Sequence, residues 1–263
     1  MTASSEPRIT VERQDHVLLL GLNRVEKRNA FDLDMLTQLV QAFGDYERDD
    51  DLRCALVFAH GDHFTAGLDL ANIGETFRTG WTMPEGSADP WGTFGGRRLT
   101  KPLLVAAQGY CFTLGIELML AADINLCASN ARFAQLEVQR GIFPFGGATL
   151  RMHQVAGWGN AMRWLLTGDP FDAHEAYRIG LVQEVTAPEE LMPRALWLAQ
   201  RVAAQAPLGI RATLASARRS LDEGEEAAAR LLPAMACELL STEDAQEGLN
   251  AMLERREGRF QGK

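Results

Sequence analysis

Two glutamates stand in surroundings where acid–base chemistry is possible. Glu117 lies in the apolar segment YCFTLGIELML, and Glu137 follows FAQL and precedes the glycine-rich stretch VQRGIFPFGGAT. The apolar neighbours of Glu117 favour its burial, and two carboxylates around one water can act as general base and general acid. For Glu117, the alternative is a carboxylate that only complements a helix dipole. One strand-like segment separates the two glutamates, which is enough to return both to one side of the fold.

Backbone N–H groups that can hold an oxyanion are expected at two turns nearby. If Thr113 caps the helix that carries Glu117, the N–H groups of Leu114 and Gly115 lie in its first turn without intrahelical partners. The segment FTAGLDL, residues 64–70, follows a strand-like run, and its glycine permits close approach of a ligand to the backbone. The N–H of Leu68 is therefore a candidate second donor, and such donors stabilise developing negative charge.

Other familiar sites are absent from the sequence. It has no G-x-S-x-G, no G-x-x-x-x-G-K-[ST] and no H-E-x-x-H, and GWGNAM from Gly157 lacks the third glycine of a dinucleotide fingerprint. His60, Asp62 and His63 follow a strand-like run without a further ligand set, so we expect a solvated turn and no metal. Asp69 is expected to begin a helix and not to be a catalyst.

The elements that must position these residues alternate between strand-like and helix-like patterns. Apolar residues at helical spacing from Leu33 to Phe43 predict a helix after the first strand. From about Pro188 to the end, the sequence is rich in alanine and charged residues and has a helical pattern. Strands separated by helices indicate an α/β fold with parallel pairing. The strand predictions cover residues 16–22, 53–59, 103–107, 124–128 and 181–185.

The segment 72–98 breaks this alternation, because it mixes aromatic residues with many glycines and prolines. Long irregular loops rich in aromatics often form a lid or a pocket wall. The competing interpretation is a disordered connector.

Composition limits the remaining choices. The chain has 263 residues and a formal charge of −9, with 46% hydrophobic and 23% charged residues, as in an ordinary globular protein of one large domain. The acidic balance argues against nucleic acid as a partner. No apolar run is long enough to predict a membrane helix and no signal peptide is recognised. Four cysteines without a C-x-x-C pair indicate reduced thiols, so we expect a cytoplasmic location.

At this point the chain resembles the enoyl-CoA hydratase (crotonase) family, through several motifs in the family's order from about residue 16 to about residue 186. The motifs that carry the resemblance are LNRVEKRNAF, HFTAGLDL, KPLLVAAQGYC, ADI, FAQLEVQRGIFPFGGAT and LTGDPFDAHEAYRIGLVQEV. The resemblance implies a crotonase-like spiral of ββα units over residues 1–200. It also implies a helical C-terminal oligomerisation region over residues 201–263, which builds homotrimers or dimers of trimers.

The resemblance further implies hydration of a trans-2-enoyl-CoA to a 3-hydroxyacyl-CoA, with coenzyme A as part of the substrate and no separate cofactor. Glu117 and Glu137 fall on the catalytic positions of base and acid, and the N–H groups of Leu68 and Leu114 fall on the oxyanion positions. The residues near coenzyme A-binding positions are Arg24, Lys27, Arg28, Ala66, Gly67, Leu70 and Gly115. The resemblance adds the C-terminal RREGRF as a further candidate for contacts to the nucleotide, from a neighbouring subunit.

The chain departs from the family's pattern at several positions around the site. Thr113-Leu114-Gly115 replaces three glycines, Leu136 replaces a proline, and Phe145 and Ala148 replace small residues. These departures leave substrate identity open. Two alternatives to a hydratase also stay open: another acyl-CoA enzyme of this type, acting as an isomerase, C–C hydrolase or retro-aldol lyase, and a coenzyme A-ester binder without activity.

Overall fold

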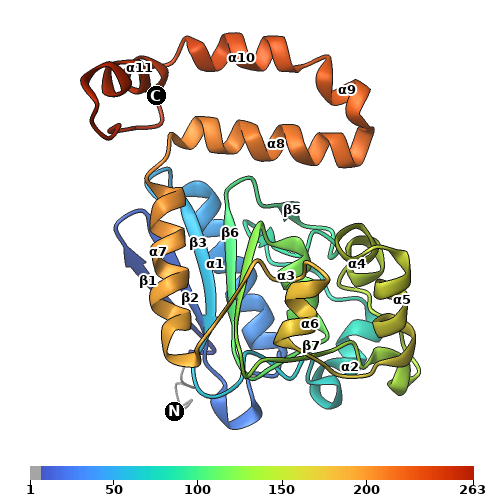
Figure 1. Ribbon diagram of the computed structural model, residues 1–263. Helices are drawn as coiled ribbons and strands as arrows, with labels where there is room; N and C mark the ends of the chain where they lie inside the picture. The colour runs from blue at the N-terminus through green and yellow to red at the C-terminus, as the bar shows by residue number, and fades with distance from the viewer. Residues whose placement is uncertain (1–6) are drawn as a thin grey trace.

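The computed structural model describes residues 7–263 and contains a six-stranded sheet flanked by helices (Figure 1). The strand order is β1-β2-β3-β6-β8-β11; the β1–β2 pair is antiparallel and the other neighbours are parallel. The strands are β1 (Ile9–Gln14), β2 (Val17–Leu22), β3 (Cys54–Ala59), β6 (Leu103–Ala107), β8 (Ile124–Ala128) and β11 (Glu184–Thr186).

Four of the five predicted strands are found where the apolar runs place them. The fifth prediction, residues 181–185, is misplaced, because the N–H groups of Leu181 and Val182 both bond back to the carbonyl of Ala176 at 2.9 and 3.4 Å. These two apolar residues therefore close the turn after a helix, and pairing with the sheet begins only at Glu184. The sequence analysis also missed β1, whose residues after Thr10 are all exposed.

A second, smaller sheet was not predicted, since its strands are too short to show an apolar pattern. Its order is β10-β9-β7, with β7 (Tyr110–Phe112), β9 (Arg132–Ala134) and β10 (Phe171–Asp172). The parallel pair β7–β9 aligns Phe112 with Ala134, so the segments leading to Glu117 and Glu137 leave the sheet at the same edge. A separate pair joins β4 (Ala88–Asp89) to β5 (Arg97–Arg98).

Helices cover both faces of the large sheet and bury the core there. Helix α1 (Leu33–Arg48) begins at Asp32, whose side chain accepts a hydrogen bond from the Met35 N–H at 2.8 Å, and it buries its apolar face on one side. Helix α7 (Leu191–Ala203) lies against the opposite face (Figure 1), where it buries Leu191 and three alanines.

The remaining helices connect the strands or form the C-terminal region. They are η1 (Val25–Lys27), α2 (Leu70–Thr79), α3 (Leu114–Ala121), η2 (Glu137–Arg140), α4 (Ala148–Ala156), α5 (Trp158–Thr167), α6 (Ala173–Arg178), η3 (Pro188–Glu190), α8 (Pro207–Glu223), α9 (Glu225–Ala229), α10 (Leu232–Leu240) and α11 (Glu243–Glu254). Among the described residues, no helix has the length and apolar character needed to cross a bilayer.

Helices α8–α11 form an arm that lies beyond one end of the sheet, with α8 and α10 side by side (Figure 1). No residue of α8 is buried. Polar contacts attach the arm to the body: Arg218 bonds to Asp123 at 2.9 Å, and Arg53 donates to the carbonyl of Phe260 at 2.9 Å. Because the arm buries so little of itself, large apolar side chains remain exposed on it.

Candidate active site

Two turns that are far apart in sequence lie against each other at the edge of the small sheet. The N–H of Thr65 donates to the carbonyl of Tyr110 at 2.8 Å, and the N–H of Phe112 donates to the carbonyl of Thr65 at 3.0 Å. Gly67 has φ +91°, and a Cβ built there would lie 1.9 Å from the Thr113 Oγ1. Only a glycine allows this close approach, so the sequence-predicted turns at Leu68 and Leu114 are brought together.

The Leu68 N–H is left free by the way its neighbours pair. Phe31 donates to the carbonyl of Gly67 at 2.8 Å and accepts from the N–H of Asp69 at 2.9 Å, so its bonds fall on either side of Leu68. Leu114 is the first residue of α3, where N–H groups have no intrahelical acceptor. Within residues 7–263 neither N–H has a hydrogen-bond acceptor, and both are available to an oxyanion.

The predicted cap at the start of α3 is wrong. Thr113 precedes the helix, but its side chain makes no capping hydrogen bond, and its φ of 48° and ψ of −111° differ from the extended conformation of a usual N-cap. The chain reaches α3 directly from β7 through this sharp turn, and the hydroxyl accepts no hydrogen bond from the N–H groups of the first helical turn. The open helix end that the sequence predicted is nonetheless present, because nothing caps it.

Glu117 lies in the first turn of α3 and is 2% exposed. Its Oε1 accepts a hydrogen bond from the Ala148 N–H at 3.2 Å, and a Cβ at Gly146 would lie 2.4 Å from its Oε2. Burial raises the pKa of Glu117 to about 7; the N–H groups of residues 146–148 lower it, and the charge of Glu137 raises it further. A carboxyl with such a pKa can exchange a proton at neutral pH.

Glu137 begins η2 after β9 and is 6% exposed. With its amide nitrogen turned toward Glu137, the buried Gln135 donates to both carboxylate oxygens at 3.1 Å. Burial raises the pKa of Glu137 to about 7, against the lowering effects of its own backbone N–H and of the Arg140 charge. The environment of Glu137 thus matches that of Glu117 in its main physical effect.

One small cavity joins these groups. It is lined by Leu68, Leu70, Thr113, Glu117, Glu137, Arg140, Ile142 and Phe145. The volume of this cavity is about 10 Å³, which is about what a single water molecule needs. The arrangement places two proton-exchanging carboxyls around one water-sized space, beside two free N–H donors.

One of the segments predicted to contact coenzyme A lines this cavity, and the basic segment is attached to it by a hydrogen bond. Lys27 and Arg28 are exposed, and the Arg28 guanidinium lies 5.6 Å from the centre of the Tyr110 ring. Ala66 donates its N–H to the Arg28 carbonyl at 2.9 Å, which ties the basic segment to the turn at Gly67. Leu70 lines the cavity.

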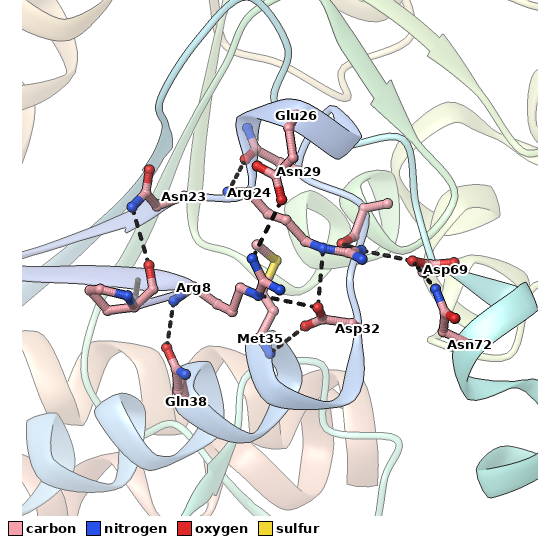
Figure 2. A network of polar contacts seen from close by, with 12 residues as sticks. Arg8, Asn23, Arg24, Glu26, Asn29, Asp32, Met35, Gln38, Asp69 and Asn72 are labelled. Atoms are coloured by element: carbon pink, nitrogen blue, oxygen red, sulfur yellow. Dashed lines mark hydrogen bonds and ion pairs between the residues drawn. The ribbon is translucent and has the colours of Figure 1, made fainter. Parts of the chain in front are cut away.

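Two of the predicted contact residues have other surroundings. Gly115 faces the interior, since a Cβ there would lie 2.5 Å from Thr65 Cγ2. Arg24 is 6% exposed, and Figure 2 shows it between Asp32 and Asp69, at 3.1 and 2.8 Å. Asp69 lies at the start of α2 as predicted, but its side chain makes no capping bond and pairs with Arg24. This ion-pair network fixes the first basic segment to the start of α2.

The segment 72–98 is irregular as predicted from residue 80 onward, apart from the short pair β4–β5, but its first residues continue helix α2 to Thr79. Its aromatic rings form a cluster: Phe77 lies 5.9 Å from Trp81, 6.0 Å from Phe94 and 5.8 Å from Phe145, between ring centres. Phe145 also lines the cavity. The segment therefore backs the wall of the site, which agrees with the pocket-wall interpretation.

The histidines of the predicted polar turn at residues 60–63 form hydrogen bonds within the protein. His60 Nε2 lies 2.8 Å from the Thr10 hydroxyl, and His63 Nδ1 accepts from the Tyr110 N–H at 3.2 Å. In the part of the chain that the structure describes, no three His, Cys, Asp or Glu side chains group as metal ligands.

The sequence analysis missed Arg140 and Ile142, which line the cavity, and two partners of the glutamates, Gln135 and the backbone N–H of Ala148. The contact of Gln135 could have been predicted from its position. It lies two residues before a candidate acid and next to the end of a buried strand, where an amide has few other partners. The Ala148 N–H belongs to the first residue of α4 and meets Glu117 across 31 positions, so no local pattern predicts this contact.

Comparison with known proteins identifies the class to which this fold and site belong. The family model described as enoyl-CoA hydratase/isomerase matches residues 12–263, and the chain belongs to that family. It is similar to a crystal structure of a probable enoyl-CoA hydratase/isomerase from Mycobacterium abscessus, with 51% identity, a TM-score of 0.95 and coverage of 97% of this chain and 99% of the other.

Two further relatives are less similar in sequence. The chain is 31% identical to enoyl-CoA hydratase EchA19 of Mycobacterium tuberculosis, over 100% of this chain and 99% of the relative. It is also 31% identical to the crotonyl-CoA hydratase of Syntrophomonas wolfei, over 96% of this chain and 97% of the relative. The crotonase-like fold that the motifs implied is confirmed.

Proposed function

We propose that this protein is an enoyl-CoA hydratase, which adds water to a trans-2-enoyl-CoA to give a 3-hydroxyacyl-CoA. The observation that carries the proposal is the water-sized cavity between Glu117 and Glu137, next to the free N–H groups of Leu68 and Leu114. Relatives at about 30% identity over the full chain carry hydratase names, which supports the same activity.

The reaction needs one group that accepts a proton and one that donates a proton. Two carboxyls whose pKa values both lie near neutrality can fill these two roles. Ionised Glu117 takes a proton from the water as its oxygen bonds to C3, and protonated Glu137 gives a proton to C2. The carbon–carbon double bond becomes single, and the negative charge that passes through the thioester oxygen is stabilised by the two N–H donors. After turnover the proton lies on Glu117, and a single transfer between the two carboxyls restores the starting state.

Recognition of the acyl-CoA thioester is assigned to the segments around both turns. The exposed cations Lys27 and Arg28 are suited to the anionic phosphates of coenzyme A, and a local cluster of this kind acts even though the whole chain is acidic. Arg24 would contribute indirectly, because its buried ion pairs hold the basic segment in place.

The arm α8–α11 is assigned to assembly into a homotrimer or a dimer of trimers. Leucine and methionine side chains stay exposed along it, among them Leu221, Leu240 and Met252 at 72%, 78% and 67%. An apolar surface of this kind on an element that packs little against its own body is suited to a second copy of the chain. Analytical ultracentrifugation tests this directly, and a monomer at micromolar concentration would contradict it.

A cytoplasmic location is also part of the proposal, since the four cysteines are free thiols. Fractionation of the source cells, followed by detection with an antibody, tests it. Recovery from a membrane or secreted fraction would contradict this assignment.

The activity is tested by the absorbance of the conjugated enoyl thioester, which disappears when water adds. Purified protein is mixed with crotonyl-CoA and with longer and branched enoyl-CoAs, and the product is confirmed by mass as the substrate plus one water. Glu117→Gln and Glu137→Gln are the matched controls, each expected to lose roughly 10²- to 10⁴-fold in turnover while acyl-CoA binding persists. Binding without turnover on any ester would favour a silent binder. A product without added water would favour an isomerase or a lyase.

A further inference from the structure

Thr113 has a backbone conformation that a β-branched residue rarely adopts. Its φ is 48° and its ψ is −111°. The peptide is held from both sides, because its N–H donates to the Ala134 carbonyl at 3.0 Å and its carbonyl accepts from the Glu117 N–H at 3.1 Å. Backbone strain of this kind persists only where the surroundings impose it, and it is concentrated at functional sites. A glycine would occupy this position without strain, so the presence of a threonine requires a reason.

The threonine places a hydroxyl at the reaction site. Thr113 lines the same cavity as Leu68, Glu117 and Glu137. Its Oγ1 lies against Gly67, where a Cβ would stand only 1.9 Å away, so the hydroxyl is beside the peptide that carries the Leu68 N–H. Within residues 7–263 the hydroxyl has no hydrogen-bond partner, and the residue as a whole is 5% exposed.

We propose that the Thr113 hydroxyl is a third hydrogen-bond donor to the thioester oxygen, beside the N–H groups of Leu68 and Leu114. This inference rests on the proposed function, because it assigns a role in the same oxyanion site. The hydroxyl hydrogen rotates freely and can turn to the substrate oxygen when it arrives. A hydrogen bond to a charged oxygen is stronger than one to a neutral carbonyl, so this donor stabilises the enolate more than the bound substrate.

Three substitutions separate the hydroxyl from the shape and strain of the residue. Thr113→Ser keeps the hydroxyl, Thr113→Val keeps the branched shape without it, and Thr113→Gly removes both the hydroxyl and the cause of the strain. We expect the serine variant to retain kcat within about threefold. The valine and glycine variants should lose about 10- to 100-fold in kcat with KM changed little, as for removal of a bond to a charged group.

A spectroscopic measurement gives a readout that does not depend on turnover. A cinnamoyl-CoA with an electron-donating ring substituent absorbs at longer wavelength when its thioester carbonyl is polarised. The bound spectrum should shift to longer wavelength in the wild-type and Thr113→Ser proteins, and clearly less in Thr113→Gly and Thr113→Val. If the wild-type enzyme did not hydrate any ester, the same spectral difference would still support the donor while contradicting the hydratase.

Two outcomes would overturn the proposal. One is Thr113→Gly with wild-type kcat and an unchanged bound spectrum. The other is an equal loss in Thr113→Ser and Thr113→Val, which would show that shape and not the hydroxyl matters. If Thr113→Val does not fold, Thr113→Gly decides the question, because the backbone conformation there suits glycine.

Discussion

Replacing Glu117 by glutamine should make the protein more stable and nearly inactive. The pKa of this carboxyl is about 7 in the folded protein, against 4.5 for an unperturbed glutamate, because burial disfavours its charged form. The folded state therefore holds the proton more tightly than the unfolded state does. The free energy of unfolding must fall as the pH rises from about 4.5 to about 7, and it then stays level.

The size of the effect follows from the size of the pKa shift. At pH 8 the folded protein carries the full penalty of the buried charge, which is about 3 kcal/mol at roughly 1.4 kcal/mol per pH unit. Glutamine cannot ionise, and its carbonyl oxygen can still accept the Ala148 N–H. We expect Glu117→Gln to raise the Tm by about 6–12 °C at pH 8, using about 2–4 °C per kcal/mol for a chain of this size.

The assay is thermal or urea unfolding of both proteins at pH 8, 6.5 and 5, with turnover measured on the same preparations. The stability difference should shrink as the pH falls and should nearly vanish below about pH 4, where wild-type Glu117 is mostly protonated in both states. A difference that stays constant with pH would mean that the substitution acts through packing. A variant that is less stable at pH 8 would refute the assignment of Glu117 as a penalised buried charge.

Four further predictions test the site from other directions. The rate of hydration should follow a bell-shaped pH profile centred near 7, since one of Glu117 and Glu137 must be ionised and the other protonated; a flat profile from pH 5 to 9 would contradict the pair. Gly146→Ala should lower kcat at least about 10-fold with the fold retained by circular dichroism, because the new Cβ would meet Glu117 Oε2 at 2.4 Å. Arg24→Met should reduce the free energy of unfolding by about 3 kcal/mol in urea, since two largely buried carboxylates at 2.8 and 3.1 Å each lose an ion pair and keep only Arg8 and Asn72 as side-chain partners. Phe145→Ala should raise kcat/KM for longer enoyl-CoAs relative to crotonyl-CoA, as it removes a ring from the cavity wall; an unchanged ratio would place the acyl chain elsewhere.

Much of the fold could be predicted because its strands and its first helix show patterns within short stretches of sequence. Apolar runs mark β2, β3, β6 and β8, and helical spacing marks α1. The two turns were recognisable because a glycine follows a strand in one, and an acidic residue follows a candidate helix start in the other. The strand at residues 184–186 was misplaced since an apolar pair that closes a turn looks like an apolar pair in a sheet.

Contacts between residues that are far apart in the sequence could not be predicted from such patterns. The Ala148 N–H reaches Glu117 across 31 positions, and the ion pairs of Arg24 with Asp69 span 45. Strands β7 and β9 have three residues each, so they show no apolar period, yet their pairing puts both glutamates at one edge. The equal pKa shift of the two carboxyls depends on burial from all sides, which no single segment encodes.

The replacement of the family's three glycines by Thr113-Leu114-Gly115 shows how side chains and backbone share this site. An oxyanion site built of N–H groups tolerates a side chain wherever that side chain points away from the substrate. Leu114 meets this condition: it is 1% exposed, its Cδ1 packs toward Gly146, and its carbonyl accepts from the Trp91 indole at 3.2 Å. Gly115 remains glycine because Thr65 and Cys111 fill the space where a Cβ would go.

Only at Thr113 does the new residue line the cavity, and there the backbone conformation is strained. Of the two replaced glycines, one therefore changes only the packing behind the site, and the other is the position at which this chain changes what the substrate meets.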